Sequence, residues 1–172
     1  KDVYMKRILI SPCSQKLRVK ENESLKNNPK NYPYWLQVIE SLKTKGYTTI
    51  QVGVAGEPDF KADELHRGLS LHNLHNLLCT CDTWISVDNF FGHFATYYKK
   101  PGIVIFGRSD PKLFGYEQNI NLLKDRKYLR QNQFDIWEND VFTEEAFVAA
   151  DVVVNAVEEM LQLLQGNEAV KL

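Results

Sequence analysis

Short apolar segments alternate with helical patterns along this chain, and this alternation most limits the folds open to it. Residues 7–11, 83–87 and 103–106 are short and rich in β-branched side chains, as expected of strands buried on both faces. Strands that alternate with helices pair in parallel through right-handed crossovers. The sequence therefore predicts an α/β fold: a single Rossmann-like domain, with an open parallel sheet and helices on both of its faces.

Apolar residues at helical spacing mark the helices. One pattern runs from Pro33 to a capping Gly46, and a second follows Ser70, which is a good N-cap residue. Further strands are expected at 48–54 and 119–123, and the closing helix at 144–165. The domain is expected to span 1–172, with its core at about 7–165. The long polar loop 12–32 and the irregular stretch 107–118 are candidate functional segments, because long loops in compact domains are uncommon unless they have a function.

Composition limits the class of protein. The chain has 172 residues, a net charge of −1 and three cysteines. We therefore expect no nucleic-acid partner, no membrane span and no disulfide framework, and a cytoplasmic location. A metal site formed by Cys13, Cys79 and Cys81 has poor zinc spacing, so reduced, partly buried thiols are the preferred interpretation.

The segment from Val87 to Ala95 carries the main functional signal. Asp88 falls where the predicted strand 83–87 stops, and His93 falls in the first turn of the helix that follows. A helix that starts there directs free N–H groups and a favourable dipole at the crevice where open α/β sheets bind ligands. Asp88, Asn89 and His93 are therefore predicted to border a phosphate or nucleotide site.

Several motifs in order resemble the carboxyl-terminal, donor-binding half of glycosyltransferase family nine, the ADP-heptose-dependent heptosyltransferases. The matching segments are Lys30-Asn31-Tyr32-Pro33, Val52-Gly53-x-x-Gly56-Glu57, Ser70-Leu71-x-x-Leu74, Asp88 to His93, and Phe106-Gly107-x-Ser109-Asp110-Pro111. The resemblance implies one Rossmann-like half of a two-half enzyme, in which the amino-terminal half supplies the acceptor contacts and the catalytic carboxylate. That half would be a second polypeptide, unless the domain acts alone or as a homo-oligomer. Met5 precedes the first strand, so the chain is expected to be either a stand-alone protein starting there or a fragment of a longer one.

The chemistry of a sugar-nucleotide donor suits these residues. The pyrophosphate gains negative charge as the glycosidic bond breaks, and His93 and Lys30 are candidates to stabilise that charge. Glu57 suits the ribose hydroxyls, as an acid does in dinucleotide-binding folds. The full set of predicted donor-binding residues is Ser14, Lys30, Glu57, Asp88, Asn89, Phe90, His93 and Ser109. No Asp-x-Asp pair is present, so no metal and no cofactor are expected, with the nucleoside-diphosphate sugar as substrate. Asp110 is the alternative candidate for the catalytic base.

Simpler interpretations stand beside these. Asp88 is also suited to be the N-cap of the following helix, Lys30 to be an ordinary solvated lysine, and Glu57 to start a helix before Pro58. His72 and His75 are spaced like a metal pair, but a solvated helix edge is favoured. Two further pairs of residues have no assigned chemistry. Arg126 and Arg130 are expected either at the mouth of a pocket or partner contact, or in a solvated basic segment. Phe134 and Trp137 are expected either to cover a sheet edge or to contact another domain.

The chain departs from the family at one important point. Asn89-Phe90 stands where the family has Thr-Gly, so the glycine that lets the backbone approach a phosphate is replaced by an aromatic residue. The sequence thus favours a metal-independent glycosyltransferase, or part of one, that binds a nucleoside-diphosphate sugar. The alternatives are a nucleotide-binding module without catalysis and an interaction domain.

Overall fold

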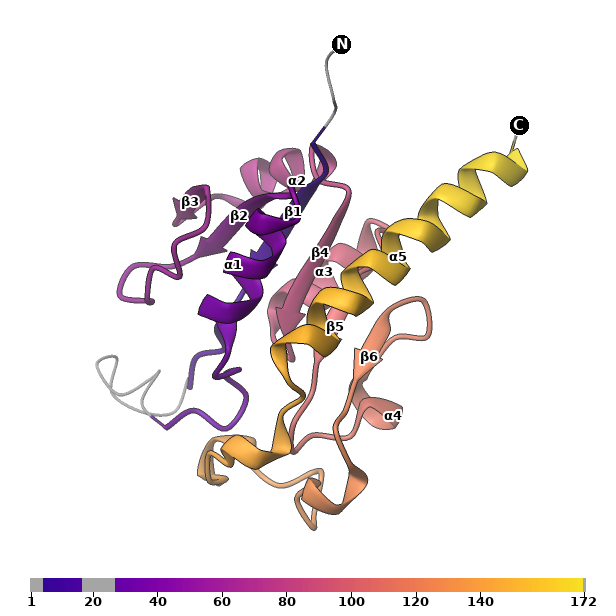
Figure 1. The fold of residues 1–172 in the computed structure, drawn as a ribbon. Coiled ribbons are helices and arrows are strands. Elements are labelled where there is room, and N and C mark those ends of the chain that lie inside the picture. Colours follow the sequence, from indigo (N-terminus) through magenta and orange to yellow (C-terminus); the bar gives the residue numbers. More distant parts are fainter. Residues whose placement is uncertain (1–4, 17–26, 172) are drawn as a thin grey trace.

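The computed structural model describes residues 5–16 and 27–171 and contains a six-stranded parallel sheet in the order β3-β2-β1-β4-β5-β6 (Figure 1). The strands are β1 (Arg7–Ser11), β2 (Thr48–Gly53), β3 (Glu64–Arg67), β4 (Thr83–Val87), β5 (Ile103–Ile105) and β6 (Ile120–Leu122). The helices are α1 (Trp35–Thr44), α2 (Leu71–Cys79), α3 (Phe90–Tyr97), α4 (Pro111–Phe114) and α5 (Ala150–Lys171). The predicted Rossmann-like α/β fold is confirmed.

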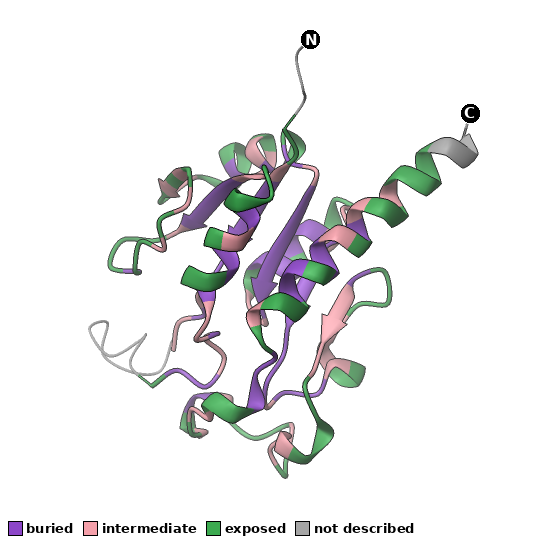
Figure 2. Ribbon diagram, in the orientation of Figure 1, coloured by how far each residue is buried: buried purple, intermediate pink, exposed green. Residues whose placement is uncertain are grey.

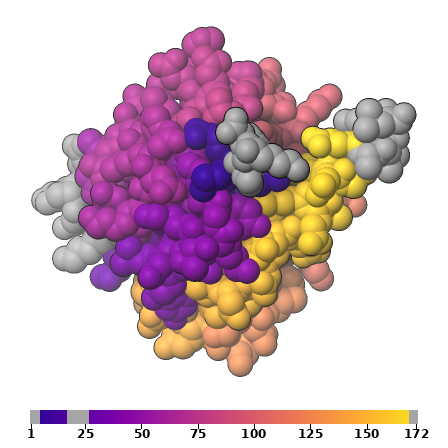
Figure 3. All heavy atoms as spheres, turned by 45° about the horizontal axis from the view of Figure 1, so that its top comes forward, coloured from indigo at the N-terminus to yellow at the C-terminus, as the bar shows by residue number. Residues whose placement is uncertain are grey.

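Each face of the sheet is covered by a separate apolar layer. Alternate residues of one strand point to opposite faces, so Ile8 and Ile10 of β1 pack in the layer with α1 and α5. Leu9, between them in sequence, packs with α2 and α3 on the other face. Figure 2 shows the result, with buried strands at the centre and exposed outer helix surfaces. On the surface, α5 lies beside the segment that contains α1 (Figure 3).

Local signals in the sequence position most of these elements as expected. Ser70 caps α2 by accepting a hydrogen bond from the N–H of Asn73. Gly46 follows α1 with a φ of 91°, a backbone conformation that favours glycine. Among the described residues, no helix has both the length and the apolar character that a membrane crossing requires.

Several boundaries differ from the sequence-based prediction. Strand β3 was not expected, because its sequence, Glu-Leu-His-Arg, lacks an apolar pattern; it forms by parallel pairing with β2 at the sheet edge. The closing helix starts at Ala150 rather than at residue 144. Residues Glu144–Ala146 form only a 3₁₀ turn, and the extended backbone of Phe147 separates this turn from α5. The stretch expected to be irregular, 107–118, contains α4.

The strand order creates a crevice that positions the candidate site. The chain leaves β1 toward β2 on one side and returns to β4 on the other, so the connections after β1 and β4 diverge at the carboxyl edge of the sheet. Ligands of open α/β folds bind at such a switch point. The end of β1, the loop that follows it and the start of α3 meet there.

Candidate functional site

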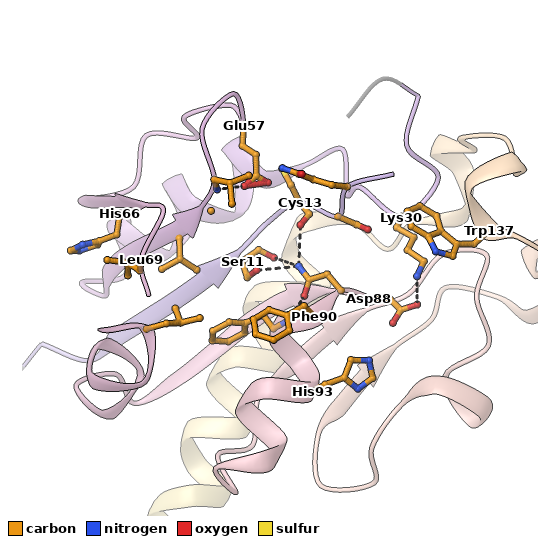
Figure 4. A pocket seen from close by; sticks show the side chains of 18 residues that line it. Ser11, Cys13, Lys30, Glu57, His66, Leu69, Asp88, Phe90, His93 and Trp137 are labelled. Carbon is orange, nitrogen blue, oxygen red and sulfur yellow. Dashed lines mark hydrogen bonds and ion pairs between the residues drawn. The ribbon is translucent and has the colours of Figure 1, made fainter. Parts of the chain in front are cut away.

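A cavity of about 460 Å³ opens at this switch point (Figure 4). Its volume is in the range of about 300–1,000 Å³ that is typical of small-molecule sites. Seven of the predicted donor-binding residues line it, namely Ser14, Lys30, Glu57, Asp88, Asn89, Phe90 and His93. Most of the residues selected from separate sequence motifs therefore meet in one cavity.

One end of the cavity carries the side chain of Lys30. Its Nζ lies 3.1 Å from Oδ2 of Asp88 and 4.3 Å from the ring centroid of Trp137. The Lys30 and Asp88 side chains are 17% and 14% exposed, so this ion pair is largely shielded from water. Lys30 is therefore not an ordinary solvated lysine, and Asp88 is occupied by the lysine rather than by a helix N–H group.

His93 lies at the same end, in the first turn of α3. Its Nδ1 is 2.8 Å from the hydroxyl of Tyr116, and the two rings meet edge to face. When the Tyr116 hydroxyl donates to Nδ1, the proton of a neutral His93 is on Nε2, where it can be donated to an anion. His93 is exposed, so a ligand in the cavity can reach it.

Asn89, and not Asp88, caps α3. Its Oδ1 accepts a hydrogen bond from the N–H of Phe91 at 2.9 Å. Its Nδ2 donates to the hydroxyl of Ser11 at 3.0 Å and to the carbonyl of Cys13 at 3.1 Å. The Asn89 amide therefore ties the start of α3 to the end of β1, and its hydrogen-bonding groups are used within the protein.

Glu57 is buried in the wall of the cavity beyond the end of β2. Its Oε1 accepts a hydrogen bond from the N–H of Val54 at 2.6 Å, and a Cβ at Gly53 would stand 2.3 Å from the same oxygen. Gly53 thus leaves the space that the carboxylate fills. Burial raises the pKa of Glu57 against the opposing hydrogen bonds from Val54 and Cys13. Burial, together with the nearby Glu57 carboxylate, also raises the pKa of the Cys13 thiol, which is therefore a poor nucleophile.

Apolar side chains form the remainder of the wall. Val52, Leu69, Leu74 and Phe91 line the cavity, with His66 and Leu69 at the end opposite Lys30 (Figure 4). Phe90, at the position where the family motif has glycine, is 57% exposed and also lines the cavity. An aromatic ring and aliphatic side chains provide a surface on which a planar base can pack.

Two predicted residues lie outside this cavity. Ser109 lines a small adjoining cleft that also touches Lys30 and Trp137. The carboxylate of Asp110 accepts two hydrogen bonds from Arg126, at 2.9 and 2.7 Å, and caps α4 through the N–H of Lys112. Arg126 is therefore not an isolated surface charge. Its hydrogen bonds hold the pKa of Asp110 below its usual range.

The other candidate metal ligands are not brought together. In the part of the chain that the structure describes, no group of three His, Cys, Asp or Glu side chains is placed to hold a metal ion. His75 stacks on Tyr98, with ring centroids 3.8 Å apart. The three cysteines form no disulfide.

Two residues of the site have no signal in the sequence. The sequence places Trp137 over a sheet edge or in a domain contact, yet it lines the cavity beside Lys30. No sequence motif includes Tyr116, although it is hydrogen-bonded to His93. Both lie in connections after β5, and only the folded chain brings them to residues that precede them in the sequence.

The fold is similar to those of bacterial glycosyltransferases. Heptosyltransferase II from Escherichia coli, the ADP-heptose lipopolysaccharide enzyme, matches with a TM-score of 0.65 at 14% identity, over 94% of this chain and 48% of its own. A family 9 glycosyltransferase from Veillonella parvula matches with a TM-score of 0.67 at 17% identity, over 92% and 46%. The dodecameric, iron-containing glycosyltransferase TibC from enterotoxigenic E. coli matches with a TM-score of 0.60 at 15% identity, over 97% and 46%.

These neighbours confirm the resemblance to family nine at the level of the fold. The chain spans less than half the length of each of them. No protein-family model and no curated protein sequence matches the chain.

Proposed function

We propose that this domain binds a nucleoside-diphosphate sugar and acts as the donor-binding half of a glycosyltransferase. The observation that carries the proposal is the composition of one cavity. Lys30 and His93 lie at one end, at the start of α3, a buried carboxylate lies in the wall, and apolar side chains line the opposite end. Diphosphate, ribose and base need these three environments, in that order.

Charge on the diphosphate would be stabilised without a metal ion. The ammonium group of Lys30 and the Nε2–H of His93 supply two donors, and the dipole of α3 favours an anion at its first turn. Asp88 pairs with Lys30 at 3.1 Å, so a bound diphosphate would compete with this carboxylate for the lysine.

We infer that the catalytic base lies on a second polypeptide half. Glu57 and Asp88 are the carboxylates among the described residues that line the cavity, and each already has a partner, the N–H of Val54 and Lys30 respectively. The neighbours, at about twice this length, have room for such a half. The same observation favours a second candidate function, in which the domain binds the nucleotide sugar without catalysing transfer.

A thermal-shift panel tests donor binding. ADP-, UDP-, GDP-, CDP- and dTDP-sugars and the corresponding nucleotides would be added separately to the protein. A ligand at about 100 times its Kd adds about 2.7 kcal/mol to the free energy of unfolding, which raises Tm by roughly 5–10 °C for a domain of this size. A shift with nucleotides of one base supports the proposal, and a flat panel overturns it. Transfer to an acceptor, measured with and without a second polypeptide, then separates the transferase from the binding module.

His93→Ala tests the diphosphate end of the site. Loss of one charge-assisted hydrogen bond costs about 1.5–3 kcal/mol, so the Kd for the nucleoside diphosphate that the panel selects should rise on the order of 10–150-fold. Isothermal titration calorimetry provides the measurement. His72→Ala, which removes an exposed histidine of α2 that does not line the cavity, is the matched control. An unchanged Kd for His93→Ala would remove this residue from the proposed site.

A further inference from the structure

The segment 126–140 is fastened to the loop that follows β5. Arg108 in that loop donates two hydrogen bonds to Asp140, at 2.7 and 3.0 Å, and Arg126 donates two to Asp110. Between these ends, the amide of Gln133 donates to the carbonyl of Arg108 at 3.0 Å. The segment is thus held at both ends and in the middle by polar contacts with a single loop.

This attachment brings Trp137 to the cavity. The ring lies on the 3₁₀ turn Trp137–Asn139 and lines both the main cavity and the adjoining cleft. Its centroid is 4.3 Å from Nζ of Lys30, within the distance of a cation–π interaction. The ring and Asp88 therefore contact the same ammonium group (Figure 4).

A diphosphate that enters the cavity would affect the two contacts of Lys30, with Asp88 and with the Trp137 ring, in different ways. A diphosphate carries the same sign of charge as Asp88 and competes with it for the hydrogen-bond donors of Lys30. The Trp137 ring attracts the ammonium through its π face and leaves donors free for phosphate oxygens. A lysine side chain also loses about 2 kcal/mol of rotamer entropy when it is fixed, so a ring that restrains it in advance favours binding.

We propose that Trp137 is a positioning residue that holds Lys30 at the diphosphate end of the cavity. The inference rests on the proposed function and extends it, because it assigns a role to a residue outside every motif that pointed to the site. The polar contacts of Arg108, Arg126 and Gln133 hold the segment that carries this ring.

The test compares Trp137→Leu with Trp137→Phe. The probes are the nucleoside diphosphate that the panel selects, from ADP, UDP, GDP, CDP and dTDP, and the corresponding nucleoside without phosphate. Trp137→Leu should weaken diphosphate binding by about 2- to 30-fold, the range of a cation–π interaction, and leave nucleoside binding unchanged. Trp137→Phe, which keeps an aromatic ring at this position, should retain most of the wild-type affinity for the diphosphate. In a Lys30→Met background, Trp137→Leu should have no further effect on the diphosphate.

Phe134→Ala is the matched control, since it removes an aromatic ring from the same segment, 80% exposed and outside the cavity. If Trp137→Leu weakens the binding of diphosphate and nucleoside equally, the ring is only part of the cavity wall, and the inference is overturned. The inference is also overturned if Trp137→Leu leaves diphosphate binding unchanged, or if its effect on diphosphate binding adds to that of Lys30→Met. If the wild-type protein binds no nucleotide in the panel, the proposed function itself fails, and this result is separate from a failure of Trp137 alone.

Fluorescence gives a second measurement that does not depend on how Trp137→Leu folds. Trp35 and Trp84 are 1% and 0% exposed, whereas Trp137 is half-buried in the cavity. The nucleoside diphosphate should change the tryptophan emission of the wild-type protein, and Trp137→Phe should abolish that change. The same change in Trp137→Phe would contradict the placement of the ring beside the bound diphosphate.

Discussion

Asp110 precedes the short helix α4, and its carboxylate serves two partners. It caps the helix through the N–H of Lys112 and accepts two hydrogen bonds from Arg126. These interactions hold its pKa below the usual range, and a carboxylate with a low pKa is a weak general base. The geometry therefore favours a structural role for this residue, which was the one candidate base within the chain.

We expect Asp110→Asn to keep the cap and lose the ion pair. Because Arg126 is half exposed, the loss in the free energy of unfolding at pH 7 should be about 1 kcal/mol. A carboxylate whose folded pKa is lowered stabilises the fold above its unfolded pKa of about 3.9, and this stabilisation is lost as the pH falls through the folded pKa. Urea unfolding should therefore show a larger difference from the wild type at pH 7 than at pH 3. Asp125→Asn, at an exposed cap, is the control, and a difference as large at pH 3 as at pH 7 would contradict the ion-pair interpretation.

Two helices of this protein start in different ways. The N-cap Ser70 of α2 is exposed and makes one hydrogen bond to its helix. The N-cap Asn89 of α3 also binds Ser11 and Cys13 at the end of β1. The start of α3 is therefore held by the sheet as well as by its own cap, which fixes the amino-terminal end of the helix at the cavity.

Alanine substitutions at the two caps should separate these roles. Ser70→Ala should lower the free energy of unfolding by about 1 kcal/mol, the usual effect of losing an N-cap. Asn89→Ala should lower it by about 2–3 kcal/mol, since partly buried hydrogen bonds to Ser11 and Cys13 are lost as well. Asn89→Asp, which keeps the cap acceptor and removes the amide donors, should fall between them. Equal effects of the two alanine variants in urea unfolding would show that the contacts with β1 add nothing.

At the scale of the whole molecule, the described residues form two apolar layers that share one sheet. Trp35 belongs to the layer with α1 and α5, and Trp84 belongs to the layer with α2 and α3. Because successive residues of β1 fill both layers, one layer cannot come apart without exposing the strand that supports the other. The described part of the chain should therefore unfold cooperatively.

Tryptophan variants in a Trp137→Phe background test this expectation. Trp35→Phe leaves Trp84 as the reporter, and Trp84→Phe leaves Trp35. Within each variant, the urea midpoints from fluorescence and from far-UV circular dichroism should coincide, as for a two-state transition. A fluorescence midpoint that departs from the circular dichroism midpoint in either variant would show that one layer unfolds separately.

The sequence by itself determined every strand except β3, most helices and the position of the candidate site. Strand and helix patterns depend on neighbours a few residues apart, so segments such as 83–87 and the cap at Ser70 were predictable. The site was predictable in outline for the same reason, because Asp88 and His93 lie within one strand-to-helix turn. The edge strand β3 was not, since pairing with β2 stabilises it and its own residues have no apolar pattern.

Only the tertiary structure decided which side chains meet. The Trp137 ring on Lys30, the Tyr116 hydroxyl on His93 and the Arg126–Asp110 pair join residues that local patterning does not relate. The same holds for the choice of Asn89 over Asp88 as the cap of α3, because Lys30 engages the aspartate from another loop. Local patterning fixes most of the backbone elements and the edge of the sheet where a ligand can bind. The partners that hold each charge within the site are set by how distant loops pack.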